Sequence, residues 1–257
     1  MIEFANKIDI PKIIKLWNEA FGDSKGDIEK FLSVFLEYVL IFRNQDDVAG
    51  MLTLLPVTKN NIPGRYVYAV ATLKKYRSQG ISTRLLDFSK KYIKENNEEF
   101  LILVPANTSL FDFYGNRGFK TASYIERKEY KYENFTKKPF DIQKISASEY
   151  IALKKLYIPS SDAVCWSEEM LFEIAKLYDG AFYKIPNINV AFFGFSSNNE
   201  FFIKELCCAD NDVKTVTDAI FTKHHYSKIY AVSKGRTPFA MSYPELNGDI
   251  YFSIALD

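Results

Sequence analysis

The sequence has few cysteines, no long apolar run and almost no net charge. Its three cysteines, Cys165, Cys207 and Cys208, fit a reducing compartment better than a disulfide framework. Because Cys207 and Cys208 are adjacent in a predicted strand, they point to opposite faces, and we predict no metal site. No apolar run approaches the roughly 20 residues of a membrane helix. The first residues, MIEFANKID, lack the pattern of a signal peptide, so we predict a cytoplasmic protein without a membrane partner.

The charge balance and the length also indicate what kind of protein this is and how many domains it has. A formal net charge of +1 argues against a dedicated nucleic-acid binder, which usually carries a basic excess. The hydrophobic fraction of 47% and the charged fraction of 25% are ordinary for a globular protein. At 257 residues the chain is long for one compact domain and comfortable for two. The aromatic content of 16% is best explained by a phenylalanine-rich core.

Two glycine-rich nucleotide motifs are also missing, namely the P-loop and the three-glycine dinucleotide fingerprint. The stretch 70–86, VATLKKYRSQGISTRLL, carries a different signal. An apolar strand ends, a short loop follows, and a helix begins at once, with Ser82 and Thr83 as candidate caps. Free backbone N–H groups at the positive end of a helix suit a phosphate, Gly80 allows close approach, and Arg77 adds a permanent charge. Alone, such a string is more often an ordinary helix start.

The downstream sequence adds a second block, 113–119, FYGNRGF, after a buried strand at 99–104. With both blocks in this order, residues 66–120 resemble the GNAT superfamily of acyl-CoA-dependent N-acyltransferases. VATLKKYRSQGIS is similar to its central strand and pyrophosphate loop, and FYGNRGF to its Phe/Leu-Tyr-x-x-x-Gly-Phe block. Ser82 replaces the usual Gly or Ala and Lys74 a frequent Pro, and neither change removes a needed backbone N–H.

The resemblance implies roles for particular residues. The backbone of Val70, Ala71 and Thr72 would pair with the pantetheine arm, and one N–H would serve the developing oxyanion. Asn107 would reach toward the cofactor, although a helix cap explains it equally well. Tyr114 would protonate the departing thiolate, unless it is a packed core aromatic. The loop residues that would hold the pyrophosphate of acetyl-CoA are Arg77, Ser78, Gln79, Gly80, Ile81, Ser82 and Thr83.

The general base cannot be identified from the strands 65–73 and 99–104, whose interiors carry no carboxylate. Water, or a group from the second half of the chain, would accept the proton that the amine loses. Asp257 is a candidate, because the tandem members of the family place a chain end in the active site.

The second half, 136–257, repeats the order of helices, antiparallel strands, helix and strand, and we predict a final strand at 250–255. The fold class is therefore α+β (α/β), with two tandem GNAT folds whose mixed central sheets are flanked by helices. The first covers 1–135 and the second, degenerate, covers 136–257, with a linker at 134–139 that an ordinary surface loop would also explain. The loop 209–212 has no glycine and two acids, so we expect one cofactor site, in the first half.

The tandem arrangement resembles the enhanced-intracellular-survival acetyltransferases, which acylate amines, although the chain is too short for their sterol-carrier-like domain. We therefore predict an N-acetyltransferase that uses acetyl-CoA and a small-molecule or peptide amine, with no nucleic-acid partner and an open oligomeric state. The alternatives are a non-catalytic acyl-CoA sensor and transfer from aminoacyl-tRNA, which the charge balance disfavours.

Overall fold

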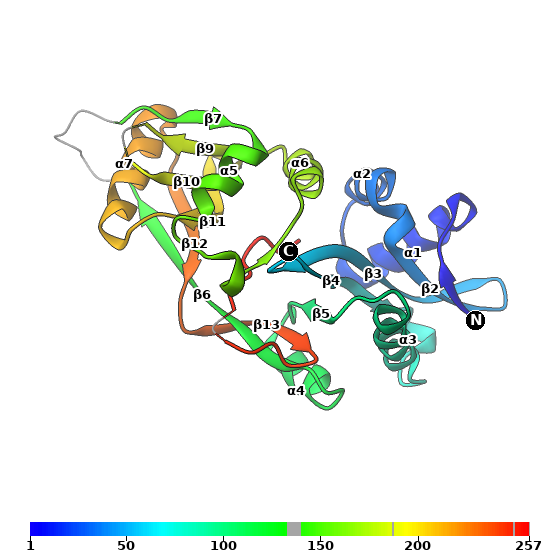
Figure 1. Cartoon of the computed structure of the whole chain (residues 1–257). Helices are drawn as coiled ribbons and strands as arrows, with labels where there is room; N and C mark the ends of the chain where they lie inside the picture. The colour runs from blue at the N-terminus through cyan, green and yellow to red at the C-terminus, as the bar shows by residue number, and fades with distance from the viewer. Residues whose placement is uncertain (133–139, 187, 249, 257) are drawn as a thin grey trace. The chain divides into compact units, whose positions relative to one another are not determined.

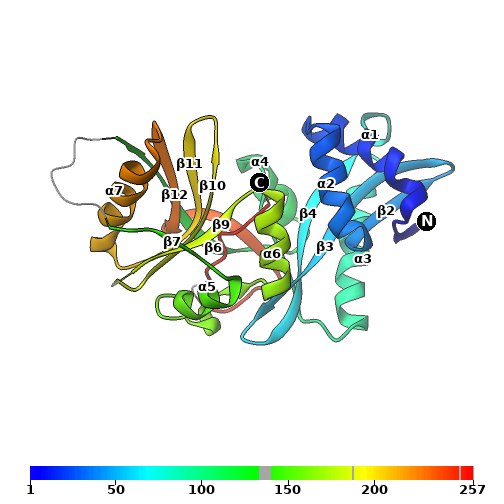
Figure 2. The ribbon, with the colours of Figure 1, turned by 90° about the horizontal axis from the view of Figure 1, so that it is seen from above.

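A computed structural model describes residues 1–132, 140–186, 188–248 and 250–256, and the predicted linker 134–139 lies outside them. The chain divides into two compact units (Figures 1 and 2). The first contains residues 1–122 and 240–247, and the second contains 123–239 and 248–257. Residues 123–132, expected in the first domain, thus group with the second unit. Residues 240–247, expected in the second, complete the first.

The first unit is built on a mixed sheet. Its strands are β1 (Ile2–Phe4), β2 (Val39–Asn44), β3 (Asp47–Lys59), β4 (Ile62–Thr72), β5 (Phe100–Leu103) and the end of β13 (Thr237–Tyr243), in that spatial order. β1 to β4 are antiparallel neighbours, β4 and β5 run parallel, and β13 pairs antiparallel with β5. The sheet therefore combines both pairing types, as predicted.

Helices cover both faces of this sheet. They are α1 (Ile10–Phe21), α2 (Lys25–Phe35), α3 (Ile81–Glu95) and α4 (Thr108–Gly115), with short 3₁₀ turns at Lys7–Asp9, Leu36–Tyr38 and Lys74–Tyr76. The ring of Tyr68 contacts Trp17 of α1 and Phe31 of α2. Its neighbour Val67 packs in the core that α3 and α4 complete. Because successive strand residues face opposite ways, α1 and α2 lie on one face and α3 and α4 on the other.

The second unit has its own mixed sheet, in the order β7 (Gln143–Ile145), β9 (Ala181–Ile185), β10 (Val190–Ser197), β11 (Glu200–Cys207), β12 (Lys228–Lys234) and β6 (Lys120–Lys131). Its helices are α5 (Ala147–Lys154), α6 (Glu168–Leu177) and α7 (Val213–His224). Shorter elements are β8 (Val164–Cys165) and 3₁₀ turns at Ser160–Asp162 and Asp210–Asp212. Phe192 packs in the core under α7, whereas Phe193 contacts Phe182, which contacts Tyr150 of α5.

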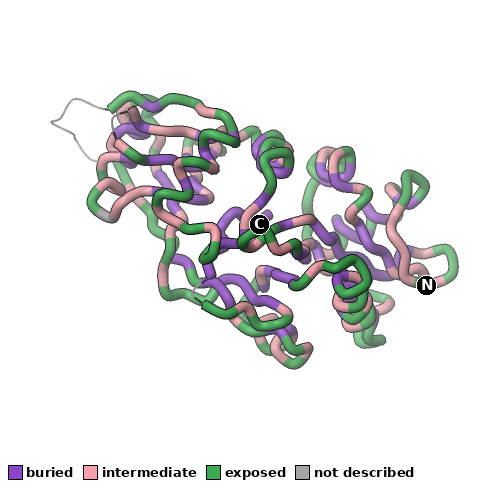
Figure 3. The backbone as a smooth tube through the Cα atoms, viewed as in Figure 1, coloured by how far each residue is buried: buried purple, intermediate pink, exposed green. Residues whose placement is uncertain are grey.

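The two units share one strand plan. In each, antiparallel strands lead to a single parallel pair, β4–β5 or β11–β12, followed by one antiparallel strand. The strand before the parallel step is bulged in both: β4 opposite Leu52 in the first unit, and β11 opposite the step from Phe193 to Gly194 in the second. Buried residues follow the strands of both sheets (Figure 3). The expectation of two related folds is confirmed, with one departure: two residues join β12 to β13, where α4 follows β5 in the first unit.

One strand prediction is wrong. Residues 250–255, expected to form the final strand, carry only isolated bridges, at Ile250 and Tyr251. The segment is nevertheless buried, and side chains hold it instead of a ladder. The Ser123 hydroxyl lies 3.1 Å from the amide N of Phe252, which donates to it, and Trp166 Nε1 donates to the Ile254 carbonyl at 2.9 Å. The last strand of the chain is β13.

Candidate active site

β4 leaves its parallel neighbour before it ends. The β4–β5 register runs from Gly64 opposite Phe100 to Val67 opposite Leu103 and stops there. Next comes a bulge in which Ala69 has φ of +51°, an uncommon value for a residue with a Cβ. Ala71 and Thr72 pair only with β3 among the described residues. The edge of β4 beyond Val67 is therefore available to another extended chain, as the resemblance implies for pantetheine.

Thr72 adds a second sign of a ligand at this edge. Its hydroxyl is buried and has no hydrogen-bond partner among the described residues. Buried hydroxyls without a partner are costly, at about 1–3 kcal/mol, and are rare in native structures. A ligand amide lying along β4 would satisfy it. The residues present therefore fit a pantetheine arm at Val70, Ala71 and Thr72.

The loop after β4 is exposed and positively charged. Ser78 has φ of +62° and Gly80 has φ of +74°, so both adopt the left-handed conformation. A Cβ at Gly80 would meet nothing within 4 Å, so the backbone conformation, and not crowding, favours glycine there. Arg77 Nε donates to the Thr72 carbonyl at 3.2 Å, which holds the guanidinium beside the end of β4. Gln79 Nε2 reaches the Lys75 carbonyl at 3.4 Å.

The first turn of α3 is uncapped. Gly80 occupies the N-cap position and no side chain of the described residues caps the helix. The amide of Arg84 donates to the Gly80 carbonyl at 3.0 Å, so the amides of Ile81, Ser82 and Thr83 precede the first helical bond. The prediction that Ser82 or Thr83 caps this helix is wrong, since the Thr83 hydroxyl accepts from Arg117 instead. Uncapped N–H groups at the positive end of a helix form an anion site.

Tyr114 lies on α4 with only 6% of its surface exposed. Its ring makes edge contacts with Phe113 and Phe119, and it belongs to the core below α3. Packing in the core does not exclude proton donation by its hydroxyl, so protonation of the thiolate stays a prediction. Burial raises the pKa of its phenol to about 12, against a smaller opposing effect of the Arg117 charge. Its hydroxyl makes no hydrogen bond within the described part of the chain, so the proton stays available for donation near neutral pH.

Asn107 caps α4. Its side-chain oxygen accepts from the Leu110 amide at 3.3 Å and from the Ser109 hydroxyl at 2.7 Å. The cap interpretation is therefore correct, and a contact with the cofactor stays a prediction. Asp257 lies outside the described residues.

Sequence and structure comparisons agree with this geometry. Residues 2–122 match the family described as an acetyltransferase (GNAT) domain. Residues 2–122 form a GNAT acetyltransferase domain. No protein of curated function matches the chain.

Solved structures with the same fold extend the likeness over both units. A GCN5-related N-acetyltransferase from Anabaena variabilis ATCC 29413 is 15% identical, with a TM-score of 0.73 over 94% of this chain and 72% of that chain. One from Kribbella flavida is 12% identical, with a TM-score of 0.71 over 94% and 71%. Eis1 from Mycobacterium abscessus is 15% identical, with a TM-score of 0.56 over 93% and 66%. At these identities the likeness concerns the fold.

Sequence reasoning missed three residues that shape the GNAT loop. Arg117 donates Nε and Nη2 to the Thr83 hydroxyl, bringing a permanent charge to the first turn of α3. Glu19 of α1 accepts the Lys74 amide at 2.6 Å, and Asp47 accepts the Tyr76 hydroxyl at 2.9 Å. These two carboxylates hold the 3₁₀ turn between β4 and Arg77. Arg117 stood inside the FYGNRGF block, but its partner lies 34 residues earlier, which no local pattern reveals.

The described part of the chain contains no group of three or more His, Cys, Asp or Glu placed to hold a metal ion. None of its helices has the length and apolar character needed to span a membrane.

Proposed function

We propose that the GNAT domain transfers an acetyl group from acetyl-CoA to a primary amine of a small molecule or peptide. The observation that carries the proposal is the uncapped first turn of α3 behind Gly80, next to the open edge of β4. An anion cradle and an unpaired strand edge are what a pyrophosphate followed by an amide-bearing arm requires. Acetyl-CoA would supply the acyl group as an activated thioester.

Different groups of the chain would bind the pyrophosphate, orient the arm and stabilise the developing negative charge. The amides of Ile81, Ser82 and Thr83 would bind the pyrophosphate, with Arg77 and Arg117 adding positive charge. Backbone groups at Val70, Ala71 and Thr72 would orient the arm, and one N–H would donate to the carbonyl oxygen as negative charge develops on it. Removing one such donor typically costs about 10²–10³ in kcat.

Tyr114 would act as the general acid. When the amine nitrogen bonds to the acyl carbon and the carbon–sulfur bond breaks, the sulfur leaves as a thiolate and takes the phenolic proton. The amine loses one proton to water or to a base, for which Asp257 remains our candidate. The phenol then regains a proton from solvent. A phenol that is protonated throughout the neutral range suits this order of events.

Isothermal titration with acetyl-CoA and with CoA tests the cofactor site. We compare the wild type with Gly80→Glu and, as a matched control, with Gly26→Glu at an exposed position in α2. A carboxylate beside the pyrophosphate would weaken binding by about 100-fold or more. The left-handed conformation at position 80 adds a strain of about 1–2 kcal/mol, so circular dichroism and melting temperature accompany the titration.

The outcomes separate the hypotheses. Micromolar binding that is lost in folded Gly80→Glu and kept in Gly26→Glu supports the site. Equal affinity in all three proteins would contradict it. Thiol release from acetyl-CoA across an amine panel then tests the chemistry, and binding without turnover would favour the alternative, a non-catalytic acyl-CoA sensor.

A further inference from the structure

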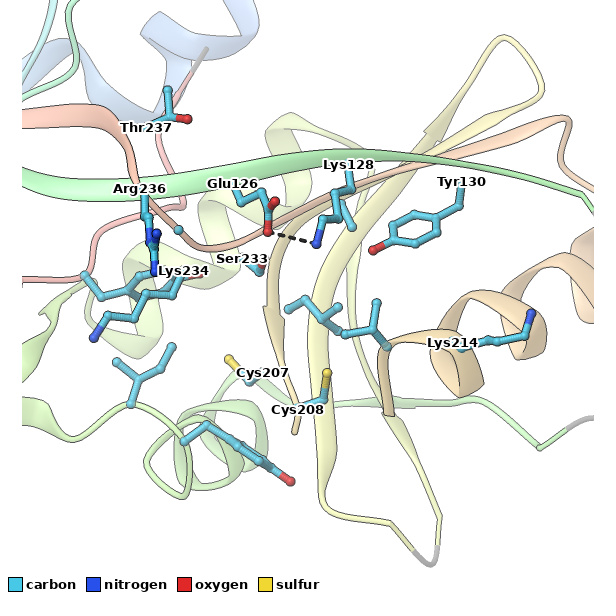
Figure 4. A pocket seen from close by; sticks show the side chains of 17 residues that line it. Glu126, Lys128, Tyr130, Cys207, Cys208, Lys214, Ser233, Lys234, Arg236 and Thr237 are labelled. Carbon is cyan, nitrogen blue, oxygen red and sulfur yellow. Dashed lines mark ion pairs between the residues drawn. The ribbon is translucent and has the colours of Figure 1, made fainter. Parts of the chain in front are cut away.

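The second unit contains a cavity of about 1070 Å³, between β6, β11, β12 and the start of α7 (Figure 4). It lies on the sheet face that α7 partly covers, because Leu206 and Ala231 line it and also belong to the core under that helix. All of its lining residues belong to the second unit. No local sequence pattern indicates this cavity.

The departure from the shared strand plan explains why this face is open. In the first unit, α4 follows β5, and its Tyr114 belongs to the same buried core cluster as Leu103 and Met241. In the second unit, β12 ends at Lys234 and β13 begins at Thr237, so no helix intervenes. The parallel pairing ends at Ile203 opposite Ala231, and the cavity lies beyond that point. It therefore occupies the position that α4 fills in the first unit.

Positive charge dominates the lining. Lys128, Lys214, Lys234 and Arg236 line the cavity together with a single carboxylate, that of Glu126. Glu126 is paired with Lys128 at 2.9 Å. Lys214 pairs with Asp218 at 3.4 Å, and its ammonium extends away from the thiols in Figure 4. An excess of cations in a concave site raises the local concentration of anions.

Lys234 and Arg236 lie at the same end of the lining (Figure 4). Gly235, between them, lies against β6: a Cβ there would be 2.4 Å from the amide nitrogen of Glu126 and 2.5 Å from the carbonyl carbon of Ile125. Only glycine allows this approach. The close contact fixes the backbone that carries both cations and so holds them at the edge of the cavity.

We propose that this cavity binds a small organic anion, whose phosphate or carboxylate groups are held by Lys234 and Arg236. The volume suits a metabolite and exceeds what a single inorganic ion needs. Tyr130 and Tyr157 supply apolar surface for the body of the ligand, and Ser233 and Thr237 supply hydroxyls. The site differs in kind from the first-unit loop, because side-chain cations, and not uncapped amides, bind the anion. The proposal does not depend on acyl transfer.

Cys208 offers a local reporter, because it lines the cavity and is partly exposed. Its neighbour Cys207 is buried, and burial raises the pKa of that thiol well above its ordinary value, so it should not react. Cys165 is partly exposed and is not among the residues that line this cavity, so it serves as an internal reference. Iodoacetamide labelling followed by mass spectrometry gives separate rates for the thiols.

The test measures labelling of the intact protein with pyrophosphate, with citrate, or with sodium chloride at equal ionic strength. A probe at about ten times its dissociation constant should slow Cys208 labelling by about tenfold and leave Cys165 unchanged. Protection by pyrophosphate alone would identify a phosphate site, by citrate alone a carboxylate site, and by both a general anion site.

Variants test whether the protection of Cys208 depends on Lys234 and Arg236. Lys234→Ala/Arg236→Ala should weaken protection by about tenfold or more. Lys144→Ala/Lys176→Ala makes the same change in charge at exposed positions of the second unit outside the lining and should keep the protection. The proposal is overturned if neither probe slows Cys208, if both cysteines slow equally, or if the Lys234/Arg236 variant is protected as well as the wild type.

Discussion

Arg117 binds Thr83 with two nitrogens of its guanidinium, at 3.0 and 2.8 Å, and so joins the end of α4 to the first turn of α3. The same guanidinium lies 3.5 Å from the centre of the Phe113 ring and donates to the Phe113 carbonyl at 2.6 Å. A planar group that stacks and forms several hydrogen bonds cannot be replaced by an ammonium. The anion cradle and the helix that carries Tyr114 are thereby held in one arrangement.

We expect Arg117→Lys to weaken acetyl-CoA binding by about tenfold, because the fork to Thr83 is lost and the α4 end is released. Titration calorimetry measures the change. Lys91→Arg, at an exposed position of α3, is the control for a Lys/Arg exchange. An unchanged affinity for acetyl-CoA would show that the link between the two helices is only structural.

Tyr114→Phe should lower kcat by about 10²-fold and leave KM for acetyl-CoA nearly unchanged. The ring and its contacts with Phe113 and Phe119 remain, and the lost hydroxyl has no described hydrogen-bond partner. Steady-state kinetics and a thermal melt check both parts. Normal turnover together with a large drop in melting temperature would leave Tyr114 as a core residue alone.

The same tyrosine predicts a pH effect on stability. Burial raises its pKa from 10.0 to about 12 in the folded state, so the folded protein holds the proton more tightly than the unfolded chain does. This contribution is complete below pH 10 and is lost as the pH rises toward 12. Between pH 9 and pH 11 the wild type should therefore lose about 1.4 kcal/mol more unfolding free energy than Tyr114→Phe. Urea unfolding at both pH values gives the difference, and parallel losses in the two proteins would refute it.

Glu205 of β11 is fully buried and should be a large single contributor to the stability of the second unit. It accepts hydrogen bonds from Lys154 at 3.0 Å, from Ser253 at 2.6 Å and from the Tyr150 hydroxyl. Burial by itself lowers the pKa of Lys154, but the Glu205 charge and hydrogen bond, together with the nearby Cys165 and Cys207, raise it overall. Glu205→Ala would leave a buried ammonium without its partner, at a cost of about 3–5 kcal/mol.

Urea unfolding measures that cost, with Glu149→Ala as the control. Glu149 pairs with Lys184 at 2.7 Å, but both side chains are partly exposed, so the loss should stay below about 1 kcal/mol. Equal losses in the two variants would mean that the buried cluster contributes no more than a surface pair.

Much of the fold was predictable because local patterns determine it. The apolar run at 99–104 predicted a buried strand, and β5 lies at Phe100–Leu103; the strand predicted at 65–73 lies within one residue of the observed end of β4 at Thr72. The segment 250–255 was misjudged because it is as apolar as a buried strand, and only its tertiary partners, such as Ser123 and Trp166, reveal its irregular path. β13 was overlooked in the same region.

The candidate site shows the same limit. The strand, loop and helix at 70–86 were readable, since each step leaves a local signature. Arg117 bound to Thr83, Glu19 bound to the Lys74 amide, and the unpartnered Thr72 hydroxyl were not, because each depends on where distant segments meet. The cavity of the second unit is open because no helix lies between β12 and β13, in contrast to α4 after β5. The absence of a helix leaves no sequence pattern from which the cavity could be predicted.

The first unit combines two segments that lie far apart in the sequence, and this affects how it folds during synthesis. Its sheet includes residues 241–243, which pair with β5, while everything else in that sheet is finished by residue 103. A ribosome adds about 5–20 residues per second, so Leu103 would wait about 7–28 seconds for its partner Met241. During translation the edge of β5 is exposed, and a chaperone or a neighbouring nascent chain could pair with it first.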